Sequence, residues 1–266
     1  SHLYRYEAAG FAVYAGVSVA LIDGTRGLLA PDQIAPVMRM HDVHQARSRL
    51  LWLEDTHNAG GGSCYPLDQL AAVVEAGRAN GLAVHLDGAR VWNACIAQDV
   101  SLTAIARHVD SLNFCFSKGL GCPVGSVLVG PRPFINDARH IRKMLGGGMR
   151  QAGVLAAAAL HALDHHVARL ADDHRHAAIL AEGFDGLAGL RVRRPVETNI
   201  VLLDTSASAY TPMELVGTLI GAGIRCLPLT ATTVRLVTHL DVSRADVEHA
   251  IATARDIVRS KIPPSP

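Results

Sequence analysis

The sequence predicts an α/β protein, with a large domain built on a mainly parallel sheet and a small C-terminal α+β domain after it. Between Gly10 and Gly130, short apolar runs alternate with segments of helical periodicity, which is the pattern of strands joined by helical crossovers. An Ala- and Leu-rich helical stretch follows, and beyond about Leu187 short strands surround few helices. The chain has 266 residues and is 49% hydrophobic, which is ample for a packed core.

Four strands and their intervening helices make up the predicted large domain. The strands are Leu50–Glu54, Leu82–Asp87, Leu112–Phe116 and Val124–Val129. The fourth strand follows the third too closely for a helical crossover, which favours an antiparallel pairing. The predicted helices are Pro31–Arg47, Leu67–Asn80 after Pro66, Ser101–Arg107 with Ser101 as N-cap, Pro133–Met144 and the long stretch Gln151–Glu182.

The small domain is predicted from a change of texture near the end of the long helical stretch. Its strands are Leu190–Arg193, Asn199–Leu203, Arg225–Pro228 and Thr233–Val237, and its helices are Pro212–Ala222 and Ser243–Lys261. We place the large domain at residues 1–165, and the connecting helix with the small domain at 166–266.

Composition excludes several classes of function. A net charge of +1 gives no field for a polyanion, so we expect neither nucleic acid nor a membrane surface as the main partner. No apolar run approaches the length of a spanning helix, and no signal-peptide pattern opens the chain. The five cysteines are dispersed and never spaced as CxxC, so we expect no disulfide framework, no metal site and a cytoplasmic location. The histidines between His161 and His176 are interpreted as solvated helix faces.

Polar side chains gather where the predicted strands end. Asp87 ends the second strand, Arg90 follows it, and Lys118 comes directly after the third. Ligands bind beyond the carboxyl ends of the strands in open parallel sheets. A carboxylate beside a pyridine nitrogen keeps that nitrogen protonated, and a lysine can hold an aldehyde cofactor as an imine. Spacing alone leaves a pyridoxal 5'-phosphate (PLP) site and an unspecified ligand site equally open.

Several longer strings carry a more specific signal. They are HLDGAR (His85–Arg90), FSKGLGCPVGSVLVG (Phe116–Gly130), RKMLGGGMRQAG (Arg142–Gly153), ALDHHVARLADDH (Ala162–His174) and VRLVTHLDVS (Val234–Ser243). In order and spacing these strings resemble the low-specificity L-threonine aldolases, over essentially the whole chain. That family belongs to fold type I of the PLP enzymes, the aspartate-aminotransferase-like fold.

The resemblance implies a role for each matching residue. Lys118 would bind PLP covalently, Asp87 would contact the pyridine nitrogen, and Arg90 would lie near the phenolic oxygen and the substrate carboxylate. Two histidines complete the large-domain set: His2 would stack on the cofactor ring, and His44 would lie near the substrate β-hydroxyl, so that either could act as the base.

Further residues are assigned on the same resemblance. Arg235 would hold the substrate carboxylate in a bidentate pair, with Asn199 beside that pocket. His57 ranks below the other two histidines, and Arg150 with the glycines Gly146–Gly148 would serve a contact between subunits of a homo-oligomer, a dimer or tetramer. The family pattern also has an upstream segment that cradles the phosphate, and only Ser1 precedes His2 here.

The expected reaction is the cleavage of threonine, allo-threonine or related β-hydroxy-α-amino acids to glycine and an aldehyde. Two alternatives stay open from the sequence. One is another PLP lyase of the same fold that performs β-elimination, and the other is a truncated homologue without catalytic activity.

Overall fold

The computed structural model describes residues 1–39 and 42–261, and the chain divides into two compact units. Unit 1 spans Ser1–Ala168 and unit 2 spans Arg169–Pro266. Each unit has a sheet of its own. Within the described residues, no helix combines the length and apolar character that crossing a bilayer requires.

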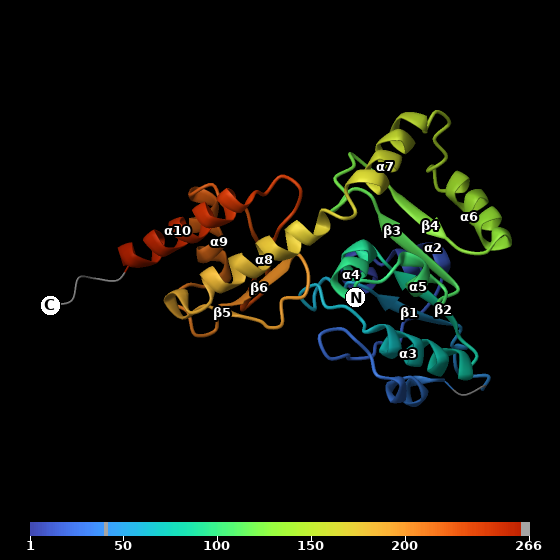
Figure 1. The fold of residues 1–266 in the computed structure, drawn as a ribbon. Helices are drawn as coiled ribbons and strands as arrows, with labels where there is room; N and C mark the ends of the chain where they lie inside the picture. Colours follow the sequence, from blue (N-terminus) through green and yellow to red (C-terminus); the bar gives the residue numbers. More distant parts are fainter. Residues whose placement is uncertain (40–41, 262–266) are drawn as a thin grey trace. The chain divides into compact units, whose positions relative to one another are not determined.

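The sheet of unit 1 has four strands in the order β1-β2-β3-β4 (Figure 1). They are β1 (Leu50–Glu54), β2 (Ala83–Asp87), β3 (Ser111–Cys115) and β4 (Ser126–Val129). The first three strands run parallel, and β4 pairs antiparallel with β3. The predicted fold class is therefore confirmed, as are all four strands and the antiparallel fourth.

Seven helices accompany this sheet in the described part of unit 1. They are α1 (His2–Tyr6), α2 (Gly10–Ala15), α3 (Leu67–Ala79), α4 (Val91–Gln98), α5 (Leu102–Ala106), α6 (Arg132–Met144) and α7 (Gly153–His165). Ser101 caps α5 as predicted, because its hydroxyl accepts a hydrogen bond from the amide of Ala104 (3.2 Å). The short helices α1, α2 and α4 were not predicted.

The helix predicted over Pro31–Arg47 is wrong in its described part. The structure has only two 3-10 turns, Pro31–Gln33 and Ala35–Val37, and 42–49 has no helix. Pro36 lacks an amide hydrogen and disfavours the helical conformation of the residue before it, so the apolar spacing could not extend into a continuous helix.

Helix α3 packs closely on β1 and β2 because a glycine faces them. A β-carbon on Gly77 would lie 2.9 Å from Leu51 Cδ2 and 3.5 Å from Val84 Cγ2. Leu51 and Val84 are buried and are register partners on the two strands. The apolar side chains of these strands thus form the core beneath α3, and the other face of the sheet is left for polar side chains.

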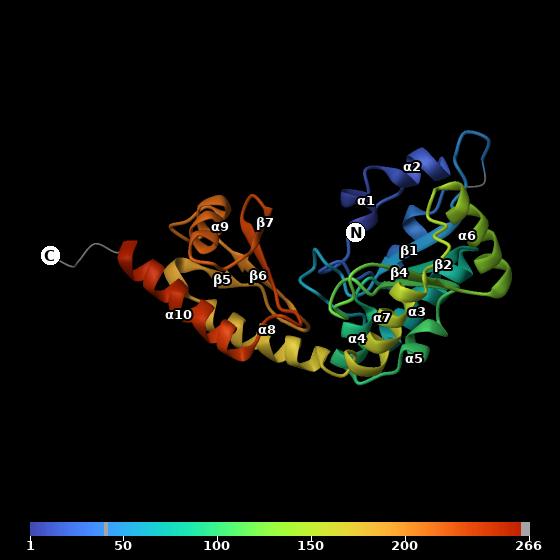
Figure 2. The same ribbon diagram turned by 90° about the horizontal axis from the view of Figure 1, so that it is seen from above.

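Unit 2 contains an antiparallel sheet in the order β5-β6-β8-β7. Its strands are β5 (Arg191–Val192), β6 (Ile200–Asp204), β7 (Leu227–Thr230) and β8 (Thr233–Val237). Its helices are α8 (Leu170–Phe184), the 3-10 turn Leu187–Gly189, α9 (Pro212–Gly221) and α10 (Arg244–Lys261). Helices α8 and α10 lie side by side in both views (Figures 1 and 2).

The predicted continuous helix Gln151–Glu182 is wrong, since the structure has α7 and α8 separated by a turn at 166–169. A ring nitrogen of His166 bonds the carbonyl of Leu120 at 2.6 Å, a long-range contact that the local pattern does not reveal. Asp172 and Asp173 lie in the first turn of α8, where carboxylates favour a helix N-terminus. These two acids were the available signal for a second helix start.

Candidate functional site

One face of the unit 1 sheet carries two rows of mainly polar side chains near its carboxyl edge. The rows are Trp52, His85 and Ser111, followed by Glu54, Asp87 and Asn113. Side chains two residues apart on a strand point to the same face, so both rows share one side of the sheet. The second row brings two carboxylates, of Glu54 and Asp87, and the amide of Asn113 to the edge at which ligands bind in parallel sheets.

Asp87 is the centre of this edge and is only 8% exposed. Its Oδ1 accepts hydrogen bonds from the amide of Ala89 and from Asn113 Nδ2, both at 3.2 Å. The next residue has to be glycine, because a β-carbon on Gly88 would lie 2.8 Å from the carbonyl oxygen of Asn113. The tight turn after β2 therefore holds the carboxylate in one orientation.

Lys118 lies in the turn that follows β3, and its side chain is partly buried. The turn is closed by backbone hydrogen bonds from Gly121 to the Lys118 carbonyl (2.9 Å) and from Cys122 to the Phe116 carbonyl (3.0 Å). Gly121 has a φ of +72°, which favours glycine. Since β2 and β3 are parallel neighbours, Lys118 and Asp87 leave the sheet at the same edge.

Glu54 is 5% exposed and accepts hydrogen bonds from two segments beside this edge. Its Oε2 accepts the backbone amide of His2 at 2.6 Å, and its Oε1 accepts the amide of Asn58 at 2.9 Å. Asn58 Oδ1 in turn contacts Arg90 Nη1 at 3.5 Å. The structure thus joins His2, Glu54, Asn58 and Arg90 around the end of β1. No role for Glu54 is predicted from the sequence, although its place at a strand end, three residues before His57, is a usable signal.

His57 is buried beside Glu54 and is held in one tautomer. Its Nδ1 accepts the amide of Gly60 (3.0 Å), so the hydrogen of the neutral ring is on Nε2, which lies 3.8 Å from Glu54 Oε2. Burial lowers the pKa of His57 despite the opposing effect of Glu54. Gly27 packs flat on the ring, because a β-carbon there would lie 2.3 Å from His57 Cγ.

The two histidines proposed as bases have different surroundings. His2 begins α1, its Nε2 lies 2.9 Å from Glu7 Oε1, and its ring packs on Tyr6. His44 lies in an exposed turn, where its amide donates to Asp42 Oδ1 (2.8 Å). The contacts described for residues 1–39 and 42–261 do not join His44 to the group around Glu54.

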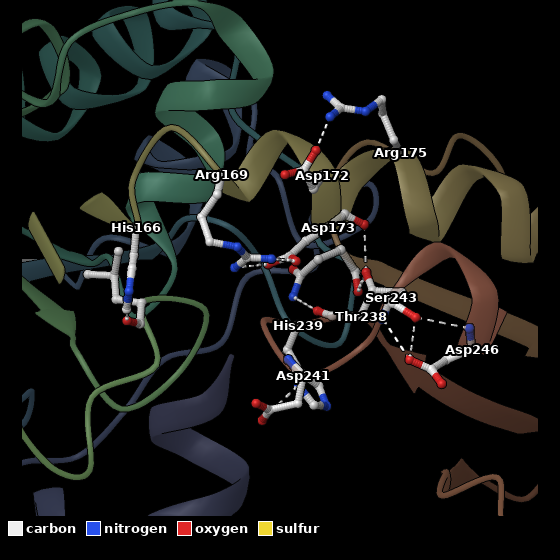
Figure 3. Close-up of polar contacts among 12 residues, drawn as sticks. His166, Arg169, Asp172, Asp173, Arg175, Thr238, His239, Asp241, Ser243 and Asp246 are labelled. Carbon is white, nitrogen blue, oxygen red and sulfur yellow. Dashed lines mark hydrogen bonds and ion pairs between the residues drawn. The ribbon is translucent and has the colours of Figure 1, made fainter. Parts of the chain in front are cut away.

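The remaining predicted site residues belong to unit 2. Arg235 is partly buried on β8 opposite Leu202. Asn199 is 1% exposed, just ahead of β6, and its Nδ2 donates to the Thr238 carbonyl (2.9 Å). Thr238 Oγ1 donates to the carbonyl of Asp173 (2.6 Å), and the buried Asp173 carboxylate is paired with Arg169 (Figure 3). Asn199 is therefore a fixed part of the small unit's framework.

A family model described as beta-eliminating lyase matches residues 1–208. The chain belongs to the beta-eliminating lyase family. It is 42% identical to the low specificity L-threonine aldolase of Escherichia coli strain K12, covering 95% of this chain and 73% of that protein. It is 39% identical to a probable low-specificity L-threonine aldolase of Arabidopsis thaliana, covering 98% and 75%.

Solved structures agree with this membership at the level of the fold. A threonine aldolase of Leishmania major superimposes with a TM-score of 0.78 at 20% identity, covering 97% of this chain and 75% of that one. A variant aspartate aminotransferase of Thermus thermophilus gives a TM-score of 0.70 at 19% identity, covering 94% and 67%. The expected fold type I architecture is confirmed.

Members of the beta-eliminating lyase family depend on PLP, and the edge of the unit 1 sheet fits its ring and aldehyde. Lys118 supplies an amine at the same edge as the Asp87 carboxylate. Within the described residues, both hydrogen bonds to that carboxylate end on Oδ1, which leaves Oδ2 for a ring nitrogen. The donor set is thus the one that a protonated pyridine and an imine require.

Proposed function

We propose that this chain cleaves β-hydroxy-α-amino acids such as L-threonine and L-allo-threonine to glycine and an aldehyde. The observation that carries the proposal is the 42% identity to a low specificity L-threonine aldolase over 95% of the chain. The carboxylate and the amine at one edge of the sheet support it, because cleavage next to an amino-bearing carbon needs an electron sink.

Three residues of unit 1 would hold PLP. Lys118 would bind PLP covalently, and its amine would be released when the substrate amine takes its place. Asp87 Oδ2 would keep the ring nitrogen protonated. Arg90 would lie near the phenolic oxygen. When bound, PLP would accept the electron pair released as the bond between Cα and Cβ of the substrate breaks. The burial of Asp87 supports its role, since a dry carboxylate interacts more strongly with a cation.

A histidine would remove the proton of the substrate β-hydroxyl as the carbon–carbon bond breaks. His2 is supported by the short hydrogen bond that ties its backbone amide to Glu54 at the sheet edge. His44 is the second candidate, and it lies in an exposed turn. His57 is less suited to this step, because its Nδ1 already accepts the amide of Gly60.

Unit 2 would bind the substrate carboxylate. A guanidinium matches a carboxylate with two parallel hydrogen bonds, and Arg235 is the residue we assign to this pair. Asn199 would keep the neighbouring backbone in place, since its amide already bonds the carbonyl of Thr238.

The assembly and the compartment are also proposals. We propose a homo-oligomer, a dimer or a tetramer, in the cytoplasm. None of the five cysteines, all of which lie in the described part of the chain, forms a disulfide, which is compatible with a reducing environment. Light scattering after size-exclusion chromatography measures the mass of the assembly, and a monomer would contradict this part of the proposal.

Product analysis tests the reaction directly. With L-threonine and PLP we expect equal amounts of glycine and acetaldehyde. A keto acid with ammonia would instead identify β-elimination, the reaction of the alternative PLP lyase. Binding of PLP without turnover of any β-hydroxy-α-amino acid would favour the alternative of a homologue without catalytic activity.

A further inference from the structure

A chain of four polar side chains runs across β2 and β3 behind the Asp87 carboxylate. Ser111 Oγ lies 2.8 Å from His85 Nδ1, and His85 Nε2 lies 3.0 Å from Asn113 Oδ1. Asn113 Nδ2 then lies 3.2 Å from Asp87 Oδ1. His85 pairs in register with Ser111, and Asp87 with Asn113, so the backbone itself brings the four side chains together.

The chemistry of these groups allows a single order of protons. An ionised carboxylate only accepts hydrogen bonds, so the amide of Asn113 must turn its Nδ2 toward Asp87. Its Oδ1 then faces His85 and can only accept, which requires the hydrogen of the imidazole on Nε2. His85 Nδ1 is consequently an acceptor, and Ser111 donates its hydroxyl hydrogen to it. Each side chain thereby fixes the orientation of the next.

The surroundings of His85 favour the neutral form of its imidazole ring and restrict the rotation of the ring. The residue is 7% exposed, and its ring packs on Trp52 with a centroid distance of 4.4 Å. Burial lowers the pKa of His85, although Asn113 and Asp87 act in the opposite direction. A neutral, buried ring with both nitrogens bonded cannot rotate without leaving polar atoms unpaired, which is costly.

We propose that His85 and Asn113 are positioning residues for the Asp87 carboxylate, which would bind the cofactor. By directing the Asn113 amide onto Oδ1, they leave Oδ2 of Asp87 turned toward the pyridine nitrogen. This inference rests on the proposed PLP-dependent function, which assigns Asp87 to that nitrogen. Neither residue touches the reacting atoms in this role, so their effect is on how firmly Asp87 holds the ring.

Substitution of His85 tests this positioning role. His85→Leu removes the donor to Asn113, and we expect PLP to bind about three- to tenfold more weakly, the cost of one hydrogen bond. His85→Gln retains an N–H donor, and we expect it to restore most of that loss. His249→Leu, on the exposed face of α10, is the matched control and should bind PLP as the unaltered protein does. Absorbance titration with PLP measures all four dissociation constants.

Steady-state kinetics add a second readout. The leucine variant at position 85 should lose kcat while the KM for threonine changes little, because the substrate carboxylate is bound elsewhere. Unchanged PLP affinity in this variant, or equal losses in the leucine and glutamine variants, would overturn the positioning role.

Nitrogen-15 NMR of the PLP-free protein tests the proton order without any substitution or activity. The proposal predicts a neutral His85 with its hydrogen on Nε2. A signal from the Nδ1–H tautomer or from an imidazolium would overturn it. Failure of the unaltered protein to bind PLP would refute the proposed function, whereas the NMR result would still decide the order of protons.

Discussion

Single polar atoms at strand ends determine what this protein can do. Oδ1 of the Asp87 carboxylate accepts two hydrogen bonds, from the amide of Ala89 and from Asn113 Nδ2, and we propose Oδ2 as the partner of the ring nitrogen. Glu54, one strand away, uses its two oxygens to accept the backbone amides of His2, at the start of α1, and of Asn58, in the loop after β1. Two neighbouring carboxylates in the same register row thus have different tasks, which follow from the number of donors that each oxygen meets.

Arg235→Lys should raise the KM for L-threonine by roughly tenfold or more, with a smaller effect on kcat. A lysine is a point charge and cannot form the two parallel hydrogen bonds of a guanidinium with a carboxylate. Steady-state kinetics measure the effect. Arg191→Lys, exposed on β5 of the same sheet, is the matched control and should leave KM unchanged. An unchanged KM at position 235 would remove Arg235 from the proposed carboxylate pocket.

The elements are brought together closely by glycines at a few contacts. A β-carbon on Gly183 in α8 would lie 2.3 Å from Ile251 Cδ1 of α10, so these two helices approach each other over a position without a side chain. Gly217 in α9 is exposed and has open space around the position of a β-carbon. Glycine therefore allows close packing in α8, whereas in α9 it only lowers the stability of the helix.

Gly183→Ala and Gly217→Ala should consequently have opposite effects on the free energy of unfolding. We expect Gly183→Ala to destabilise the protein by about 1–3 kcal/mol through overpacking. We expect Gly217→Ala to stabilise it by about 0.5–1 kcal/mol, because alanine is the better helix former. Urea unfolding measures both. Equal effects of the two substitutions would show that the contact between α8 and α10 is looser than described.

At the scale of the whole molecule, the proposed site residues divide between the two units. The covalent amine and the ring carboxylate belong to unit 1, and the proposed carboxylate ligand Arg235 belongs to unit 2. Each unit has a sheet of its own, and unit 2 has a core formed by α8, α9, α10 and the inner strands.

Stability of the whole molecule should fall with acid partly through His174 in α8, which is partly buried rather than on a solvated helix face as predicted. Burial lowers the pKa of His174 from its ordinary value of 6.5 to about 4. Below pH 6.5 the unfolded chain binds this proton and the folded chain does not, so stability declines until about pH 4, where the folded form also binds it. His174→Leu should reduce the loss of unfolding free energy between pH 7 and pH 5 by roughly 2 kcal/mol.

Urea unfolding of both proteins at the two pH values measures this difference. An identical pH dependence of the unaltered protein and the variant would contradict the buried, neutral state of His174.

Much of this architecture could be predicted from the sequence, because buried strands have clear apolar runs. Leu50–Glu54 and Thr233–Val237 were predicted with the bounds that the structure gives. The local sequence signals the break between α7 and α8 only through the two acids that begin α8, and the bond from His166 to the Leu120 carbonyl is long-range and cannot be derived from the local pattern.

The candidate site was predictable only in part. Asp87 and Lys118 could be predicted to share an edge because each follows a strand. The hydrogen bond from the His2 amide to Glu54 joins residues far apart in the sequence. The hydrogen bond from Asn113 to Asp87 depends on strand register. Neither could be derived from spacing.

Identifying the lysine that binds PLP covalently is the most direct test of the proposed function. The chain has three lysines, Lys118, Lys143 and Lys261, so borohydride reduction of the PLP-loaded protein followed by peptide mapping can distinguish them. The account predicts the reduced cofactor on Lys118, and loss of the visible absorbance band in Lys118→Ala. Attachment to Lys143 or Lys261, or retention of that band in the variant, would contradict it.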